Sequence, residues 1–196
     1  MSGMTWVTAM PVIVPDTQIE AIDELIDTQI GQLPAKETHL GLPRQTEIKT
    51  IAADLAVGIV RGDDPGDDFD GIVIPTFYSG REERLAIARV VASRMLDTAE
   101  SACRSSADGA HDCPSSALCQ LVEDARDGDE VREEIAAAIL MPTKDFRKWA
   151  TLLDTERTPP IGKQERVRRR RKALADSYAV PLDLARRRLK ALALED

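Results

Sequence analysis

All three cysteines of this chain and one of its two histidines lie in a single stretch of seventeen residues. Cys103, His111, Cys113 and Cys119 follow the spacing C-x7-H-x-C-x5-C, and thiolate sulfur and imidazole nitrogen are ligands that zinc prefers. The stretch lacks the C-x2-C pair that is typical of structural zinc sites. We expect three reduced thiols in a serine-rich loop, with Cys119 buried on the following helix, and keep a structural zinc ion as the alternative. A disulfide is not expected in a reducing compartment.

A second group of potential metal ligands is the aspartate-rich segment RGDDPGDDFD at 61–70. Calcium loops require oxygen ligands at alternating positions and a bidentate acid at the end. The five aspartates do not keep that spacing, and glycine and proline interrupt them. We interpret the segment as a solvated hairpin loop that joins a strand at 57–60 to a strand at 71–75. The remaining histidine, His39, is expected in a loop.

The middle of the chain is expected to form a strand followed by a long helix. Residues 71–75 are a short apolar run between glycine and proline, which is typical of a strand. Ser79 and Glu82 have the spacing of a capping box, in which each side chain accepts a hydrogen bond from a backbone N–H group. From Arg81 onward apolar residues recur with a helical period: Leu85, Ile87, Ala88, Val91, Ala92 and Met95.

This arrangement resembles the ImmA/IrrE family of zinc metallopeptidases, which act on phage and stress-response repressors. In that family a strand and a serine-containing turn lead into a helix with the motif A-H-E-x-x-H. Its two histidines bind zinc, and its glutamate is the general base. Here the motif falls on residues 88–93, where Arg89, Val90 and Ser93 replace the first histidine, the base and the second histidine. A guanidinium has no lone pair to give a metal, and valine cannot take up a proton.

A second helix carries the same resemblance. The family's third zinc ligand is a glutamate in a segment that reads roughly E-A-N-x-F-A-A-x-L-L-M-P, and this chain has VREEIAAAILMP at 131–142. The ligand position falls on Val131, and a slip of one residue would offer Glu130 instead. Segments 47–60 and 174–189 resemble the family's first helix and strand and its C-terminal helical pair. The matches keep the family's order along most of the chain.

The resemblance implies a degenerate site that holds neither zinc nor another cofactor. With arginine, two valines and a serine at the four positions, the set falls short of the three protein donors that zinc requires. A buried cation must be paired, so we expect Arg89 to contact a carboxylate on the 130–141 helix, Glu130 or Glu134 by preference, or else to face water at the mouth of the groove.

The expected fold class is α+β, mostly helical, with a small sheet of about three antiparallel or mixed strands. The resemblance implies a zincin-like core at 1–156, and a proline-rich linker then leads to a helix-turn-helix-like pair within 157–196. Val180 is the expected turn residue of that pair. The periodicity predicts helices at 16–30, with Asp16 as N-cap, and at 45–56, 81–96, 114–124, 127–142, 143–153, 164–178 and 181–192.

Charge divides the chain unevenly. Residues 157–196 carry twelve Lys and Arg against five Asp and Glu, whereas the remainder carries fourteen against 29. The basic side chains of the C-terminal helices predict either a surface that binds the phosphate backbone of DNA or a face that docks on the acidic body. We expect docking for the first helix and solvent exposure for 186–188. The residues concerned are Arg166, Arg168, Arg169, Arg170, Arg171, Lys172, Arg186, Arg187, Arg188 and Lys190.

The composition is that of an ordinary globular protein. No run approaches the ~20 consecutive apolar residues that span a bilayer. The first fifteen residues lack a positive region followed by a continuous apolar one, so we expect no signal peptide and a cytoplasmic location. Neither a membrane nor a small-molecule substrate is expected as a partner.

Three hypotheses of function follow. The first is a catalytically inactive ImmA/IrrE-like regulator, related by the same resemblance to phages or mobile elements, that binds a repressor or another regulatory protein without cleaving it. The second is a DNA-associated regulator that acts through the arginine-rich C-terminal helices. The third is an enzyme whose metal site has moved to His111 and the cysteines.

Overall fold

The computed structural model describes residues 14–36, 43, 45–62, 71–107, 115–155 and 162–194. In this part of the chain the structure is mostly helical, as predicted, and no helix there has the length and apolar character needed to cross a membrane. The elements in chain order are α1 (Asp16–Gln29), β1 (Ala35–Lys36), β2 (Gln45–Thr46), α2 (Ile48–Asp54), β3 (Gly58–Arg61), β4 (Gly71–Ile74), α3 (Gly80–Ala107), α4 (Ser116–Asp127), α5 (Glu130–Leu140), α6 (Thr143–Thr155), α7 (Lys163–Tyr178) and α8 (Leu182–Ala191).

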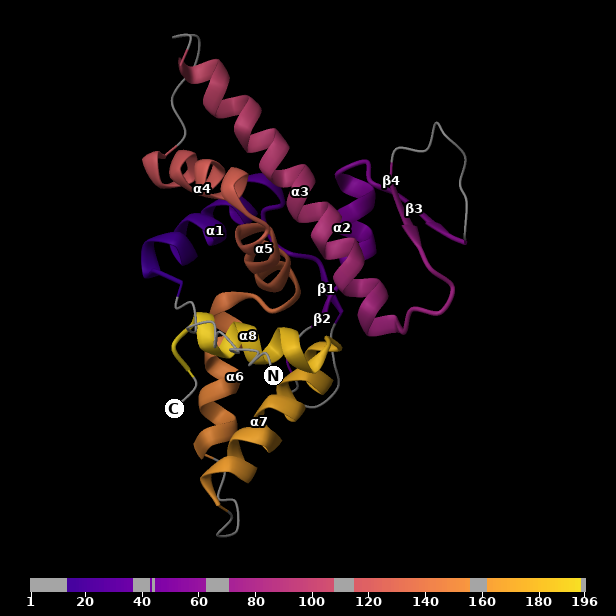
Figure 1. The fold of residues 1–196 in the computed structure, drawn as a ribbon, viewed down its shortest axis with the longest axis vertical. Helices are drawn as coiled ribbons and strands as arrows, with labels where there is room; N and C mark the ends of the chain where they lie inside the picture. Colours follow the sequence, from indigo (N-terminus) through magenta and orange to yellow (C-terminus); the bar gives the residue numbers. More distant parts are fainter. Residues whose placement is uncertain are drawn as a thin grey trace, which may run out of the picture.

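The long helix α3 organises the fold (Figure 1). It packs most extensively on α5, with α1 and α4 on the same side, while α2 and the β3–β4 pair lie on the other side. Helices α6, α7 and α8 form the lower part of the view. Because both α3 and α5 bury alanines, the two helix backbones can approach closely. The buried alanines are Ala88, Ala92, Ala99, Ala136, Ala137 and Ala138.

The predicted capping box at the start of α3 is confirmed. The backbone N–H of Ser79 donates to Glu82 Oε2 at 2.7 Å, and the backbone N–H of Glu82 donates to Ser79 Oγ at 3.4 Å. The loop predicted around Cys103 is wrong, because α3 continues to Ala107. Serine hydroxyls there donate to backbone carbonyl oxygens one turn earlier, which is compatible with a helix.

The strands β3 and β4 pair in parallel, with Gly58 opposite Gly71. The predicted hairpin is therefore wrong, although both strands lie where the sequence places them. Nine residues connect the end of β3 to the start of β4. At about 3.3 Å per extended residue they are long enough to run back along the length of a four-residue strand, as parallel pairing requires. The predicted sheet of about three strands is also wrong within the described residues, since β1 and β2 pair only with each other, antiparallel.

A buried carboxylate fixes β3 and α2 to α3. Glu83, in the first turn of α3, is 5% exposed. Lys49 of α2 places its Nζ 2.6 Å from Glu83 Oε1, and Arg61 of β3 pairs with Glu83 Oε2. One carboxylate thus joins three separate elements of the chain. Periodicity gives no sign of this contact, because each residue belongs to a different element.

Two helix starts differ from the prediction. The N-cap of α1 is Pro15, so Asp16 is its first helical residue and not its cap. Gln45 and Thr46 form β2, and α2 begins only at Ile48. Thr46 is buried and donates its hydroxyl to the backbone carbonyl oxygen of Ile139 on α5 at 2.8 Å. This tertiary contact overrides the helical pattern that the sequence shows there.

Three helices end in the same way. At Ala56, Ala179 and Ala193 the backbone is left-handed, with φ of 55°, 51° and 52°. The N–H of the next residue donates to the carbonyl oxygen five residues earlier, as in the Schellman motif, where glycine is usual at the left-handed position. That next residue is apolar and lies in or against the core, and the three are Val57, Val180 and Leu194.

The C-terminal pair has its expected turn residue, because Val180 between α7 and α8 is fully buried. Helix α8 packs on α5, and α7 packs on α6 and β2. The division of the chain at residue 157 stays a prediction.

Arg188 of α8 is 1% exposed, so the expected exposure of residues 186–188 is wrong for this side chain. It lies one helical turn from Leu184, which is also buried, and the phase of α8 therefore turns it inward. Its Nη1 lies 3.4 Å from Glu134 Oε2, and its Nη2 donates to Thr143 Oγ1 at 2.7 Å. Thr143 in turn donates to Asp23 Oδ1 at 2.8 Å. Burial raises the pKa of Glu134, and the charge of Arg188 opposes that rise.

This buried pair makes a prediction for stability. Glu134→Leu leaves the Arg188 guanidinium buried without its counter-charge, and we expect it to lower the free energy of unfolding by about 3–5 kcal/mol. Adding Arg188→Met removes the stranded charge, so the double variant should recover most of that stability. Urea unfolding followed by circular dichroism measures both. A double variant as unstable as the sum of the two single variants would contradict the pairing.

Candidate functional site

The four positions that the resemblance assigns to a zinc site lie on two helices that pack on each other. Residues 89, 90 and 93 belong to α3, and residue 131 belongs to α5. Arg89 is exposed, Val90 and Ser93 are half-buried, and Val131 is buried. Because residues four apart share a helix face, Arg89 and Ser93 lie on the same side of α3.

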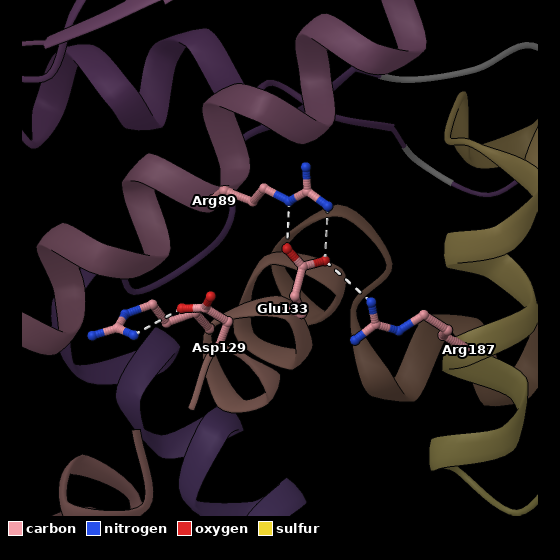
Figure 2. Close-up of polar contacts among 5 residues, drawn as sticks. Arg89, Asp129, Glu133 and Arg187 are labelled. Atoms are coloured by element: carbon pink, nitrogen blue, oxygen red, sulfur yellow. Dashed lines mark hydrogen bonds and ion pairs between the residues drawn. The ribbon is translucent and has the colours of Figure 1, made fainter. Parts of the chain in front are cut away.

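Arg89 forms a bidentate ion pair with Glu133 of α5 (Figure 2). Its Nε donates to Glu133 Oε1 at 2.5 Å, and its Nη2 donates to Oε2 at 3.1 Å. The expectation of a carboxylate partner on this helix is confirmed, but the two residues named for it are wrong. Glu130 is exposed, and Glu134 faces Arg188. Side chains of successive helix residues point about 100° apart, so Glu133 and Glu134 point to different sides of α5.

Glu133 also meets a cation from the C-terminal pair. Arg187 Nη1 lies 3.4 Å from Glu133 Oε2, and the side chains of Arg89 and Arg187 are 51% and 46% exposed. We call Arg89, Glu133 and Arg187 the arginine rim. Two guanidinium groups around one carboxylate leave an excess positive charge at the surface. Ion pairs at the surface contribute only about 0–1 kcal/mol, so we expect these half-exposed arginines to add little to the stability of the fold.

The residues at these positions do not fit a zinc ion. Among the described residues, Glu133 is the carboxylate that contacts residue 89, and the protonated guanidinium of Arg89 already binds it. The valines at 90 and 131 offer no donor atom, so three protein ligands cannot be assembled. Within the described residues, no group of three or more His, Cys, Asp or Glu side chains is placed to hold a metal ion.

Two of the four proposed ligands in the cysteine stretch are described. Cys103 on α3 and Cys119 on α4 are both half-buried thiols, and their Sγ atoms lie 2.9 Å apart. His111 and Cys113 lie outside the described residues, as do His39 and the aspartates at 63–70. The structural zinc ion therefore stays a prediction, and so does the solvated aspartate loop.

The basic residues of the C-terminal pair fall into two groups. Arg170 and Arg188 are buried, and Arg170 pairs with Asp154 of α6 and donates to the Leu194 carbonyl oxygen. The expected docking of α7 on the body thus runs through Arg170. The other basic residues are exposed or half-buried, namely Arg166, Arg168, Arg169, Arg171, Lys172, Arg186, Arg187 and Lys190.

Sequence reasoning missed an open depression of about 520 Å³ where β2, the start of α2 and the first turns of α3 meet. Thr46, Lys49, Glu83 and Arg84 are among its lining residues. Arg84 Nη1 donates to the Thr46 carbonyl oxygen at 3.1 Å, and burial lowers the pKa of Arg84. Glu83 and Lys49 already pair with each other, so we assign no ligand to the depression. Glu133 was missed as well, and only the phase of α5 against α3 could have singled it out.

No family model, curated protein or solved structure matches this chain. The resemblance to the ImmA/IrrE peptidases therefore rests on the sequence motifs quoted above.

The proximity of residues 89 and 133 can be tested by introducing zinc ligands on α3. In Arg89→His/Ser93→His, two imidazoles one turn apart on α3 join the Glu133 carboxylate, which supplies the three protein donors of a zinc site. We expect this variant to retain one zinc ion per chain after dialysis, measured by inductively coupled plasma mass spectrometry. Adding Glu133→Gln should weaken zinc binding by roughly tenfold or more. Equal zinc affinity with and without Glu133→Gln would contradict the placement.

Proposed function

We propose that this chain is a catalytically inactive ImmA/IrrE-like regulatory protein that binds a repressor or another regulatory protein without cleaving it. An origin in a phage or mobile element belongs to the same proposal. The observation that supports it is that Arg89, at the position that the resemblance gives to the first zinc-binding histidine, forms an ion pair with Glu133. Valine at position 90 removes the general base, so binding is the activity left to such a scaffold.

An exposed aromatic residue beside α3 favours a protein as the partner. Phe77 is 82% exposed in the turn between β4 and α3, and its ring meets that of Tyr78 edge-on, with centroids 5.3 Å apart. Aromatic residues and arginines are the types most enriched at binding hot spots. Helix α3 rises about 1.5 Å per residue, so Arg89 lies roughly 14 Å along the axis from Gly80. An interface of standard size, about 800 Å² on each partner, is wide enough to span that distance.

The proposal is tested by capturing partners from the source organism on the immobilised full chain. We expect a helix-turn-helix repressor or similar regulator to be retained intact, with and without a chelator. Phe77→Ala and Arg89→Ala should each weaken binding of that purified partner by roughly tenfold or more, measured by calorimetry. The matched controls are Leu152→Ala and Arg147→Ala on α6, whose side chains are also exposed.

Two results would contradict this proposed function. One is chelator-sensitive cleavage of the captured partner by the pure protein. The other is a partner whose affinity falls equally in the α6 controls and in the Phe77 and Arg89 variants, because binding would then not involve the face beside α3.

The second candidate function is DNA contact through α7 and α8. The observation that favours it is the exposure of the α7 arginines, since the Arg168 and Arg169 side chains are 84% and 57% exposed. Each also pairs with Glu165, so part of their charge is already matched within the helix.

The DNA candidate predicts an effect of Arg166→Ala/Arg168→Ala/Arg169→Ala, which leaves the buried Arg170 in place. Binding to duplex DNA should weaken uniformly across sequences, and the salt slope should flatten by up to ~0.9 for each phosphate that the variant no longer neutralises. The control, Lys144→Ala/Arg147→Ala/Lys148→Ala, removes three exposed cations from α6. An equal fall in affinity in the control would indicate a general charge effect and no dedicated DNA surface.

A further inference from the structure

The two thiols between α3 and α4 have no part in the proposed function. Cys103 stands near the C-terminal end of α3, and Cys119 stands in the first turns of α4. Their Sγ atoms are 2.9 Å apart, and a disulfide bond measures about 2.05 Å, so less than about 1 Å separates them from bonding distance. Two helices that are distinct in sequence thus bring two thiols into direct contact.

Neighbouring contacts hold both helices in this position. Ser115 caps α4 by accepting a hydrogen bond from the Leu118 N–H at 3.2 Å, and its hydroxyl donates to Glu24 Oε2 of α1 at 2.7 Å. Arg126, near the other end of α4, pairs with Glu100 of α3. The approach of the thiols therefore does not depend on the sulfur contact alone, and bond formation requires little backbone movement.

We propose that Cys103 and Cys119 are a reversible oxidation site that reacts with small-molecule disulfides of the glutathione type. One thiolate attacks a sulfur of the oxidised disulfide, forms a mixed disulfide and releases one thiol. The second thiolate attacks the protein sulfur of that mixed disulfide, forms the Cys103–Cys119 bond and releases the second thiol. Two electrons pass to the small molecule, and the two cysteine protons end on the two thiols that it yields.

Oxidation would link α4 to α3 covalently through a Cys103–Cys119 disulfide. The bond closes a loop with fifteen residues between the two cysteines, which restricts the unfolded chain. Helix α4 also packs on α1 and α5, so the bond reinforces the side of α3 on which these helices lie. The expectation of reduced thiols then describes one of two states, and the ratio of small thiol to disulfide selects between them.

The test uses the full chain and three variants, Cys103→Ser, Cys113→Ser and Cys119→Ser, incubated with oxidised glutathione. We expect Cys113→Ser to lose both of its thiols without gaining the mass of glutathione, wild type to form the same Cys103–Cys119 bond, and Cys103→Ser and Cys119→Ser to stop at a mixed disulfide with glutathione at the remaining partner. Trypsin leaves Cys113 and Cys119 on one peptide, 105–126, so the Cys113→Ser variant assigns the bond by mass spectrometry. Its melting temperature should rise by roughly 5–10 °C on oxidation and return with dithiothreitol.

The outcome in Cys113→Ser decides the proposal. Thiols that stay reduced there under glutathione conditions that oxidise dithiothreitol would overturn it, as would a bond in wild type that Cys113→Ser abolishes. Stoichiometric zinc that blocks oxidation of the purified protein would overturn it as well. If a serine variant does not fold, alkylation and peptide mapping of oxidised wild type with a second protease that separates Cys113 from Cys119 gives the same assignment.

Discussion

Arg188 is the largest side chain that is fully buried in the described residues, and its charge has to be matched inside the protein. Glu134 and Thr143 contact it directly, and Asp23 joins through Thr143, so α5, α6 and α1 all contribute. Helix α8 can place Arg188 against these partners in only one rotation about its own axis. The same rotation brings Arg187, the preceding residue, beside Glu133. The arginine rim at the surface is therefore positioned by a network in the interior.

The charge asymmetry of the sequence is partly matched within the fold. Arg170 pairs with Asp154, and Arg188 pairs with Glu134, so these two buried cations of the basic segment face carboxylates of the acidic body. What is left on the surface is a smaller set of arginines than the sequence suggests. The basic cluster thus contains buried arginines, which are paired inside the protein, and exposed ones, which a partner can reach.

Local signals in the sequence predicted local structure well. The capping box at Ser79 and the turn at Val180 depend on near neighbours, and both were found. The parallel pairing of β3 and β4 was missed, because strand direction depends on the path of a connection that no short motif encodes. The partner of Arg89 was placed on the correct helix but at the wrong residue, since the rotation of α5 against α3 is set by packing. The inward turn of Arg188 was missed for the same reason.

The alanine at the left-handed end of α2 has a consequence for how this chain is specified. Alanine is the best helix former, so Ala56 itself does not stop the helix as glycine would, and the stop signal comes from the apolar strand pattern that follows it. The next residue, Val57, leads directly into β3, as the sequence predicts. Val57 is buried, and its N–H group donates to the carbonyl oxygen of Ala52. A left-handed alanine costs free energy that glycine would not, and the burial of the residue after it helps to offset that cost at the boundary between α2 and β3.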